Sequence, residues 1–215
     1  MACCAFDETV NDQFTKEKAT QELDRYRRKG VGPTTRRLID GLSRAGLVGG
    51  TLLDVGSGIG SLTFELLDRG ARRAVLVDAS AAYAAAAADE AARREQTADV
   101  EFARGDFLDL AKTLSPASVV TLDRVICCYP LYEPLLNEAL RLAERGLAIS
   151  YPHDRWYVRA AMGLENAMRR RRKSRFRTFV HPQTHMRQLI ARAGFDLVSR
   201  RRTLIWSADV FLRRQ

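Results

Sequence analysis

The chain has 215 residues, 46% of them hydrophobic, which is enough for one well-buried domain with modest additions. It contains no run of about 18 apolar residues, so we expect no transmembrane segment. Residues 1–20 lack the charged, apolar and small-residue zones of a signal peptide, and a cytoplasmic protein is therefore expected. The formal net charge of +9 is concentrated in residues 169–177 (RRRRKSRFR) and 200–202, which indicates an acidic partner.

The first part of the chain has helical character. Residues 7–29 are charged and loosely helical, and residues 34–46 place Leu38, Ile39 and Leu42 on one helix face. These segments precede the first strand-like stretch. We therefore predict an N-terminal helical cap over residues 1–46.

Strand-like and helical stretches then alternate. Such alternation predicts an α/β fold with a parallel sheet covered on both faces, and right-handed crossovers make it doubly wound, or Rossmann-like. The predicted strands cover residues 51–56, 73–78, 99–106, 117–123 and 146–152, and the predicted helices cover residues 61–68, 81–96 and 134–144.

The pattern changes after Pro152. A helix rich in Arg and Met is predicted at about 154–171, followed by the basic tract and by a helix over residues 183–193. Residues 195–213 are typical of two antiparallel strands hinged near Arg201. We expect a seven-stranded domain over residues 47–215 that ends in this hairpin, with a helical and basic lid at about 153–182.

A glycine-rich loop follows the first predicted strand in the stretch LLDVGSGIGS, residues 52–61. Gly56 and Gly58 allow a tight turn and a close approach to a ligand, and Gly60 lets the next helix pack near the strand. The spacing G-x-G-x-G departs from the dinucleotide pattern G-x-G-x-x-G. Asp54 would also repel a pyrophosphate, whereas a cationic ligand such as S-adenosylmethionine would tolerate it.

Two more aspartates end predicted strands. Asp78 lies 20 residues after Gly58, the spacing at which an acidic side chain accepts hydrogen bonds from ribose hydroxyls. Asp106 could accept from an adenine amino group, with Phe107 covering the ring. Each aspartate could instead cap the helix that follows it.

These residues resemble the class I S-adenosylmethionine-dependent methyltransferases, over roughly residues 45–215. The resemblance implies S-adenosylmethionine as cofactor. It also implies a cofactor site made of Asp54, Gly56, Ser57, Gly58, Gly60, Asp78, Ala79, Asp106 and Phe107.

A closer resemblance lies in LDRVICCYP, residues 122–130, which is similar to a segment of the magnesium-protoporphyrin O-methyltransferases. Those enzymes usually have His where this chain has Cys128. The chain also resembles uncharacterised bacterial methyltransferase-like proteins with an N-terminal Cys-Cys, a Y-R-R-K-G stretch (residues 26–30) and S-Y-P-x-D-x-W (residues 150–156). That group implies no particular substrate.

The acceptor side of the site is predicted at the exit of the fourth strand. A carboxylate acceptor needs no base and would be positioned by cations such as Arg124 or Arg155, whereas a hydroxyl or amine needs a proton acceptor. We predict O-methylation of a small anionic or amphipathic molecule. The candidate catalytic residues are Asp123, Arg124, Cys128 and Tyr129. His153 and His181 are further proton acceptors by chemistry, but as loop histidines they are expected to be exposed.

Several alternatives remain open at this stage. The basic tract, with Phe176 and Phe179, could bind RNA in a non-catalytic module, although a small-molecule acceptor is favoured. The tract could also hold an anionic small molecule, lie against acidic lipid or be a solvated, cationic helix end. The adjacent pairs Cys3–Cys4 and Cys127–Cys128 are expected to be reduced, and together they could bind a metalloid for thiol-dependent methylation. They lack the C-x-x-C spacing of zinc sites, so we expect no metal. The sequence leaves the oligomeric state undetermined.

Overall fold

The computed structural model describes residues 9–214. Strands β1 to β5 are parallel, and the sheet order is β3-β2-β1-β4-β5-β7-β6, with β7 antiparallel to both of its neighbours. This confirms the predicted doubly wound, seven-stranded fold. The strands are β1 (Thr51–Val55), β2 (Arg73–Asp78), β3 (Val100–Arg104), β4 (Ala117–Asp123), β5 (Ala143–Pro152), β6 (Phe195–Arg202) and β7 (Trp206–Arg213).

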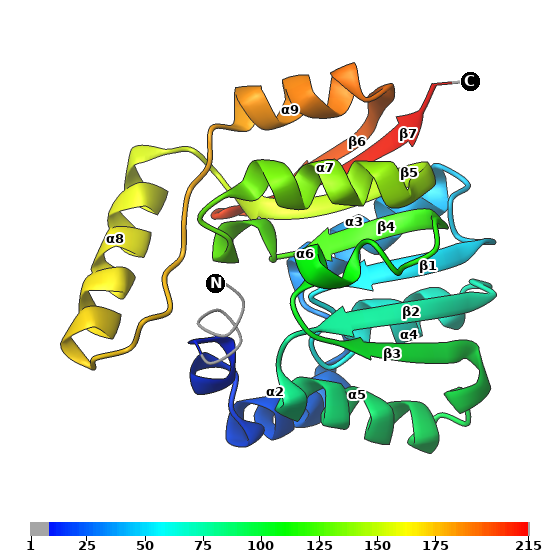
Figure 1. The fold of residues 1–215 in the computed structure, drawn as a ribbon, viewed down its shortest axis with the longest axis horizontal. Coiled ribbons are helices and arrows are strands. Elements are labelled where there is room, and N and C mark those ends of the chain that lie inside the picture. Colours follow the sequence, from blue (N-terminus) through cyan, green and yellow to red (C-terminus); the bar gives the residue numbers. More distant parts are fainter. Residues whose placement is uncertain (1–8, 215) are drawn as a thin grey trace.

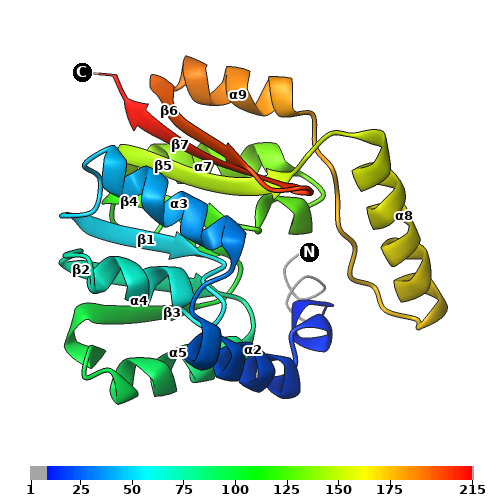
Figure 2. The ribbon, with the colours of Figure 1, turned by 180° about the vertical axis from the view of Figure 1, so that it is seen from behind.

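Helices cover both faces of the sheet (Figures 1 and 2). One apolar cluster includes residues of α7 and α9, and the other includes residues of α2 to α5. The continuous apolar runs of the strands are explained by this double cover, as in VVTL of β4, which is buried throughout. The helices are α2 (Lys16–Lys29), α3 (Pro33–Arg44), α4 (Ser61–Leu67), α5 (Ala81–Arg93), α6 (Phe107–Leu110), α7 (Tyr132–Leu142), α8 (Trp156–Arg171) and α9 (Gln183–Arg192), with short 3-10 turns η1 (Thr97–Asp99) and η2 (Ile126–Cys128).

The N-terminal segment is joined closely to the sheet. Residues 9–13 are helical, and α3 buries Leu38, Ile39 and Leu42, as its sequence pattern predicts. In the structure α3 packs against β5, β6 and β7, so its apolar face belongs to the main core. The boundary of a separate cap at residue 46 remains a prediction.

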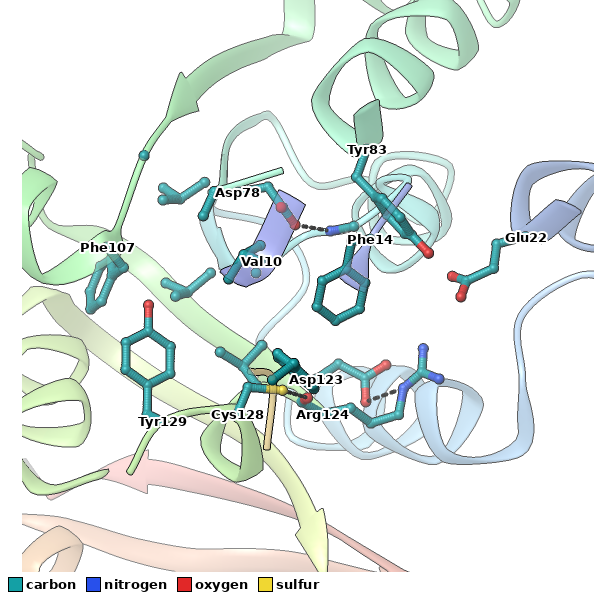
Figure 3. A pocket seen from close by; sticks show the side chains of 18 residues that line it. Val10, Phe14, Glu22, Asp78, Tyr83, Phe107, Asp123, Arg124, Cys128 and Tyr129 are labelled. Carbon is teal, nitrogen blue, oxygen red and sulfur yellow. Dashed lines mark hydrogen bonds and ion pairs between the residues drawn. The ribbon is translucent and has the colours of Figure 1, made fainter. Parts of the chain in front are cut away.

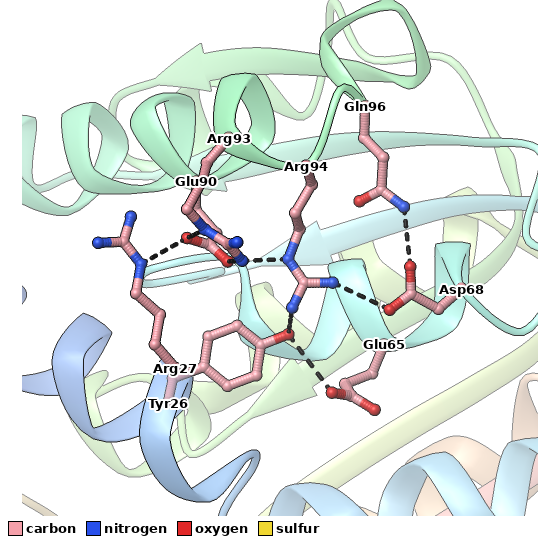
Figure 4. Close-up of polar contacts among 8 residues, drawn as sticks. All are labelled: Tyr26, Arg27, Glu65, Asp68, Glu90, Arg93, Arg94 and Gln96. Atoms are coloured by element: carbon pink, nitrogen blue, oxygen red, sulfur yellow. Dashed lines mark hydrogen bonds and ion pairs between the residues drawn. The ribbon is translucent and has the colours of Figure 1, made fainter.

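Helix α2 is attached to α5 by a buried carboxylate (Figure 4). The Glu90 side chain is fully buried and accepts hydrogen bonds from Arg27 of α2 and from Arg93 and Arg94. Burial alone would raise the pKa of Glu90, but these three guanidinium groups hold its pKa at about 2. The charge is therefore retained because it is fully paired.

The C-terminal hairpin is closed by a turn three residues long. The Thr203 N–H donates to the Trp206 carbonyl at 2.8 Å, and Thr203 Oγ1 accepts from the Trp206 N–H at 2.9 Å. The turn therefore lies at residues 203–205, just after the hinge predicted near Arg201. Since β7 starts beside Pro152, this turn lies at the edge of the sheet where the parallel strands end.

Helix α8 stands away from the sheet at that same edge (Figures 1 and 2). Val158 is its one buried residue. The chain after α8 returns beside it, because Asn166 Nδ2 donates to the Thr178 carbonyl and the Thr178 N–H donates to Asn166 Oδ1. Among the described residues no helix is long and apolar enough to cross a membrane.

Candidate active site

A cavity opens at the carboxyl ends of β1, β2 and β4, where ligands of doubly wound sheets bind (Figure 3). Nine predicted site residues line it: Gly56, Gly58, Asp78, Ala79, Phe107, Asp123, Arg124, Cys128 and Tyr129. The other lining residues are Val10, Phe14, Glu22, Val55, Val77, Tyr83, Gly105, Val125 and Phe176. Asp54, Ser57, Gly60 and Asp106 are not among the lining residues.

The glycine loop has the conformation that its sequence requires. Gly56 and Gly58 have φ angles of 62° and 58°, in the left-handed region that side chains disfavour. A Cβ on Gly56 would lie 2.5 Å from a methyl group of Val125. The loop is fixed to β2, because the N–H groups of Gly56 and Ser57 both donate to the Val77 carbonyl. Ser57 thus contributes its main chain to the shape of the cavity.

Asp78 receives two main-chain hydrogen bonds. Its Oδ2 accepts from the Gly58 N–H and its Oδ1 from the Ser80 N–H, each at 2.8 Å. Burial raises the pKa of Asp78, although both hydrogen bonds act in the opposite direction. The cap of α5 is Ser80, whose hydroxyl accepts from the Tyr83 N–H, so Asp78 is not a helix cap. Its carboxylate faces the cavity with acceptor capacity to spare.

Asp54 lies beneath the cavity. It is 2% exposed, and its two oxygens accept from the hydroxyls of Thr63 on α4 and Thr121 on β4. Burial raises the pKa of Asp54 to about 7, against the effect of the two hydroxyls. Through these two hydrogen bonds the Asp54 carboxyl connects the C-terminal end of β1 to α4 and to β4.

The shift of Asp54 predicts a pH dependence of stability. A raised carboxyl pKa contributes stability that is complete below the unfolded value of 3.8 and is lost as the pH rises to about 7. Asp54→Asn cannot ionise, so its free energy of unfolding should lack this decline. Denaturant titrations across that range check the prediction, with the exposed Asp89→Asn as control. Superimposable profiles for Asp54→Asn and wild type would contradict it.

The exit of β4 holds a carboxylate in a fixed position. Asp123 accepts from the Thr35 hydroxyl of α3 and from the Ser150 hydroxyl of β5, both at 2.5 Å. The next residue, Arg124, has a φ of 62°, which is unusual for a side chain of this size. Its guanidinium Nε lies 3.8 Å from Asp123 Oδ1. The cavity thus has an anchored acid and a half-exposed cation side by side (Figure 3).

Tyr129 and Asp106 form a pair at the other end of the cavity. The Tyr129 hydroxyl donates to Asp106 Oδ1 at 2.8 Å, and burial, together with this carboxylate, raises the pKa of Tyr129. Asp106 also accepts from the Leu108 N–H as the cap of α6. Asp106 therefore caps α6, as the helix-cap alternative predicts. Tyr129, whose hydroxyl donates its proton to Asp106, is poorly suited to accept another proton.

Cys127 and Cys128 are both free thiols, and they differ in how deeply they are buried. Cys127 is buried, Cys128 is half-buried on the cavity wall, and their sulfur atoms lie 3.9 Å apart. The hydrogen bond with Cys128, followed by burial, raises the pKa of the Cys127 thiol. Within residues 9–214 no group of three or more His, Cys, Asp and Glu side chains could hold a metal ion. Cys3 and Cys4 lie outside the described residues.

Both histidines predicted to be exposed are buried, so that expectation is wrong. His153 is 5% exposed and its Nε2 lies 3.1 Å from the Thr203 carbonyl. His181 is 9% exposed, and its Nε2 lies 2.9 Å from the Tyr129 carbonyl. Burial lowers the pKa of His181. The two rings tie loops to the sheet edge, and neither lines the cavity.

The N-terminal segment completes the cavity, although no residue of this segment was predicted to line it. Val10, Phe14 and Glu22 all line it. The Phe14 ring packs edge-on against Tyr83 of α5 at 5.5 Å and against Phe176 of the returning segment at 5.4 Å. Three distant parts of the chain therefore meet over the cavity.

The lining fits a cationic nucleoside. Three carboxylates, of Glu22, Asp78 and Asp123, face one guanidinium, and the remaining wall is largely apolar. The Tyr83 hydroxyl is buried in this wall beside the Glu22 carboxylate, and burial, followed by this carboxylate, raises the pKa of Tyr83. The negative charge that the sequence predicts beside the ligand from Asp54 is thus supplied by Glu22, Asp78 and Asp123 instead.

Comparisons with known proteins agree with this geometry. Residues 52–148 match the methyltransferase domain family. The magnesium protoporphyrin IX methyltransferase of Synechocystis, solved with bound S-adenosylhomocysteine, superposes with a TM-score of 0.72 at 20% identity, over 95% of this chain and 98% of that one. An O-methyltransferase family protein of Burkholderia thailandensis gives a TM-score of 0.69 at 18% identity, over 93% and 63% of the chains. A putative sarcosine dimethylglycine methyltransferase of Galdieria sulphuraria gives 0.65 at 12% identity, over 83% and 84%.

No curated protein matches the chain by sequence. The matched domain and the sheet order define a class I methyltransferase fold, as the glycine loop and Asp78 predict. Residues 52–148 therefore match a methyltransferase domain, and the fold of the chain is shared with the magnesium-protoporphyrin enzyme.

Proposed function

We propose that the enzyme methylates a small anionic or amphipathic acceptor, with an oxygen atom as the favoured target. The observation that carries this proposal is the position of Arg124, which supplies the positive charge among the described lining residues and lies next to the anchored Asp123. A guanidinium at this place suits a carboxylate. The apolar walls of Phe14, Val125 and Phe176 suit an acceptor with an apolar body.

Among the described lining residues, neither Tyr129 nor Asp123 is a well-placed base, which supports an acceptor that is already anionic. The Tyr129 proton is bonded to Asp106, and both oxygens of Asp123 accept hydroxyl protons. When bound, S-adenosylmethionine supplies a methyl group activated by its sulfonium. The protein then needs to align the acceptor and to exclude water, which are the tasks of the segments that meet over the cavity.

We assign the cofactor side to Gly56, Gly58, Asp78, Ala79 and Phe107, with Ser57, Gly60 and Asp54 shaping the loop from behind. Within this assignment Asp78 accepts from ribose hydroxyls. Residues 153–182 form the lid, since the returning segment contributes Phe176 to the cavity.

Asp78→Ala is expected to weaken cofactor binding by roughly 1–3 kcal/mol, the loss typical of hydrogen bonds to a charged acceptor. The Gly58 and Ser80 N–H groups also lose their acceptor, so the loop is less well positioned. Calorimetric titration with S-adenosylhomocysteine measures the loss. The affinity of Asp78→Asn, which keeps one acceptor oxygen, should lie between those of the wild type and Asp78→Ala. An unchanged affinity in Asp78→Ala would remove this residue from the site.

The acceptor proposal is tested by a labelled methyl donor and a panel of acceptors. Tetrapyrrole carboxylates, fatty acids, thiols and RNA separate the acceptor chemistries. We expect label in base-labile esters of amphipathic carboxylates. Label confined to thiols or RNA would overturn the proposal while leaving the cofactor assignment intact.

A further inference from the structure

Exposed apolar side chains gather at one edge of the molecule. Eight large apolar residues are exposed within the described chain, and six of them lie on segments that follow the carboxyl ends of the parallel strands. The most exposed are Trp156 at 81% and Leu204 at 78%. The six are Leu131, Trp156, Leu164, Met168, Leu204 and Ile205. Isolated exposed apolar residues are ordinary, but a group at one edge marks an interaction surface.

Two segments are held together to form this surface. The Tyr157 hydroxyl of α8 donates to the Leu204 carbonyl at 3.0 Å, and the His153 N–H donates to the Ile205 carbonyl at 2.8 Å. The first turn of α8 therefore lies beside the turn between β6 and β7 (Figures 1 and 2). We call Trp156, Leu204 and Ile205 the apolar tip.

The outer face of α8 continues the apolar tip. Leu164 and Met168 are four residues apart and share a helix face, and Trp156 begins the same helix. The other face is occupied, because Asn166 bonds the returning segment and Arg169 stacks on the Phe176 ring at 5.1 Å. The exposed stripe is the part of α8 that the rest of the chain does not cover.

Uncompensated positive charge lies beside the apolar tip and at the other end of α8. Arg155, Arg201 and Arg202 adjoin the tip, and residues 170–173 lie at and just beyond the C-terminal end of α8. All are exposed, and none forms an ion pair within the described chain. By contrast, Arg200 is paired with the buried Asp209. The unpaired cations account for much of the positive charge that the sequence concentrates in residues 169–177 and 200–202.

We propose that this surface docks on an anionic lipid bilayer. Exposed Trp, Leu and Ile with neighbouring Arg is the composition of interfacial membrane contacts, where apolar side chains enter the acyl boundary and cations meet lipid phosphates. RNA would account for the arginines, but aliphatic Leu204 and Ile205 offer no ring for base stacking. The surface is independent of the acceptor assignment.

Docking would turn the cavity towards the membrane. The cavity and the apolar tip lie at the same edge of the sheet, since Pro152 ends β5 beside the start of β7. An amphipathic acceptor dissolved in the bilayer could then reach the cavity without crossing water. This consequence rests on the proposed function, whereas docking itself does not.

The test uses the full chain and vesicles of phosphatidylcholine with or without phosphatidylglycerol. The chain has two tryptophans, so Trp206→Phe leaves Trp156 as the reporter. We expect flotation with anionic vesicles only. Trp156 emission should shift to the blue and be quenched by lipids brominated on their acyl chains. Equal flotation with both vesicle types, or unquenched emission, would overturn the proposal.

Variants separate insertion from charge attraction. Trp156→Ser with Leu204→Ser should lower vesicle partitioning about tenfold or more, as expected from losing buried apolar surface. Replacing Arg170, Arg171 and Arg172 by Gln should cost roughly fivefold for each arginine at low salt. Leu197→Ser is the matched control: Leu197 is 41% exposed but lies at the start of β6, near the opposite edge, and its replacement should change nothing.

The folded state of each variant is verified by its affinity for S-adenosylhomocysteine, because none of these side chains lines the cavity. If the double serine variant still binds vesicles as the wild type does, insertion is excluded. If RNA binding tracks the arginines while vesicle binding is absent, the surface belongs to a nucleic acid and the proposal is wrong.

Discussion

Gly58→Arg is expected to abolish binding of S-adenosylhomocysteine while leaving the domain folded. Gly58 lies on the cavity wall with a φ of 58°, and its N–H donates to Asp78. A Cβ there would meet the Tyr83 ring at 3.4 Å, which is ordinary contact, so the backbone can remain in place. The longer arginine side chain, however, must occupy the space assigned to the cofactor. Its positive charge would also repel a cationic ligand.

Left-handed backbone strain needs its own control. Gly46 has a φ of 66° and open space around its Cβ position, and it lies near the starts of β1 and β5, at the sheet edge opposite the cavity. Gly46→Arg should therefore show the loss of stability caused by strain, about 1–2 kcal/mol, with normal cofactor affinity. Calorimetry and thermal unfolding of both variants separate the two effects. Retained affinity in Gly58→Arg would refute the assigned pocket.

Elements with a strong local signal could be predicted from the sequence. The strands of the parallel sheet are runs of apolar residues bounded by glycine or aspartate, and double burial imposes that composition. The glycine loop is equally specific, because positive φ angles at Gly56 and Gly58 leave few other residues possible. The order of helices and strands then fixed the topology through the handedness of crossovers.

The roles of single side chains were less predictable. Asp54, Asp78 and Asp106 look alike in sequence, each ending a strand, yet one bonds two threonines below the cavity, one faces it and one caps α6. The difference depends on the register between strands, since Asp54 pairs with Leu76 and Asp78 lies two residues further towards the cavity, and local sequence does not encode that register. His153 and His181 were misjudged for a related reason, since loop carbonyls far along the chain satisfy them.

Glu22, Phe14 and Phe176 were missed as lining residues because they lie outside the sheet. They reach the cavity through contacts between segments far apart in sequence, such as the Phe14 and Phe176 rings. The network that could have suggested this arrangement is the charged pattern of α2 and α5. Its arginines and Glu90 lie on two helices that are separate in sequence, and in the structure they meet at an interface (Figure 4).

Glu90→Ala is expected to lower the free energy of unfolding by about 1.5–3 kcal/mol at neutral pH, the range for hydrogen bonds to a charged group. The effect should depend on pH with a definite sign. The folded-state pKa of about 2 lies below the ordinary 4.5, so the contribution of Glu90 is complete above pH 4.5 and is lost as the pH falls towards 2. The difference in the free energy of unfolding between wild type and Glu90→Ala should shrink over that window.

Asp89→Ala, at the exposed neighbouring position on α5, should differ little from wild type at any pH. Denaturant unfolding monitored by circular dichroism measures all three proteins, and a difference that stays constant down to pH 2 would show that the carboxylate charge is not what holds α2 to α5.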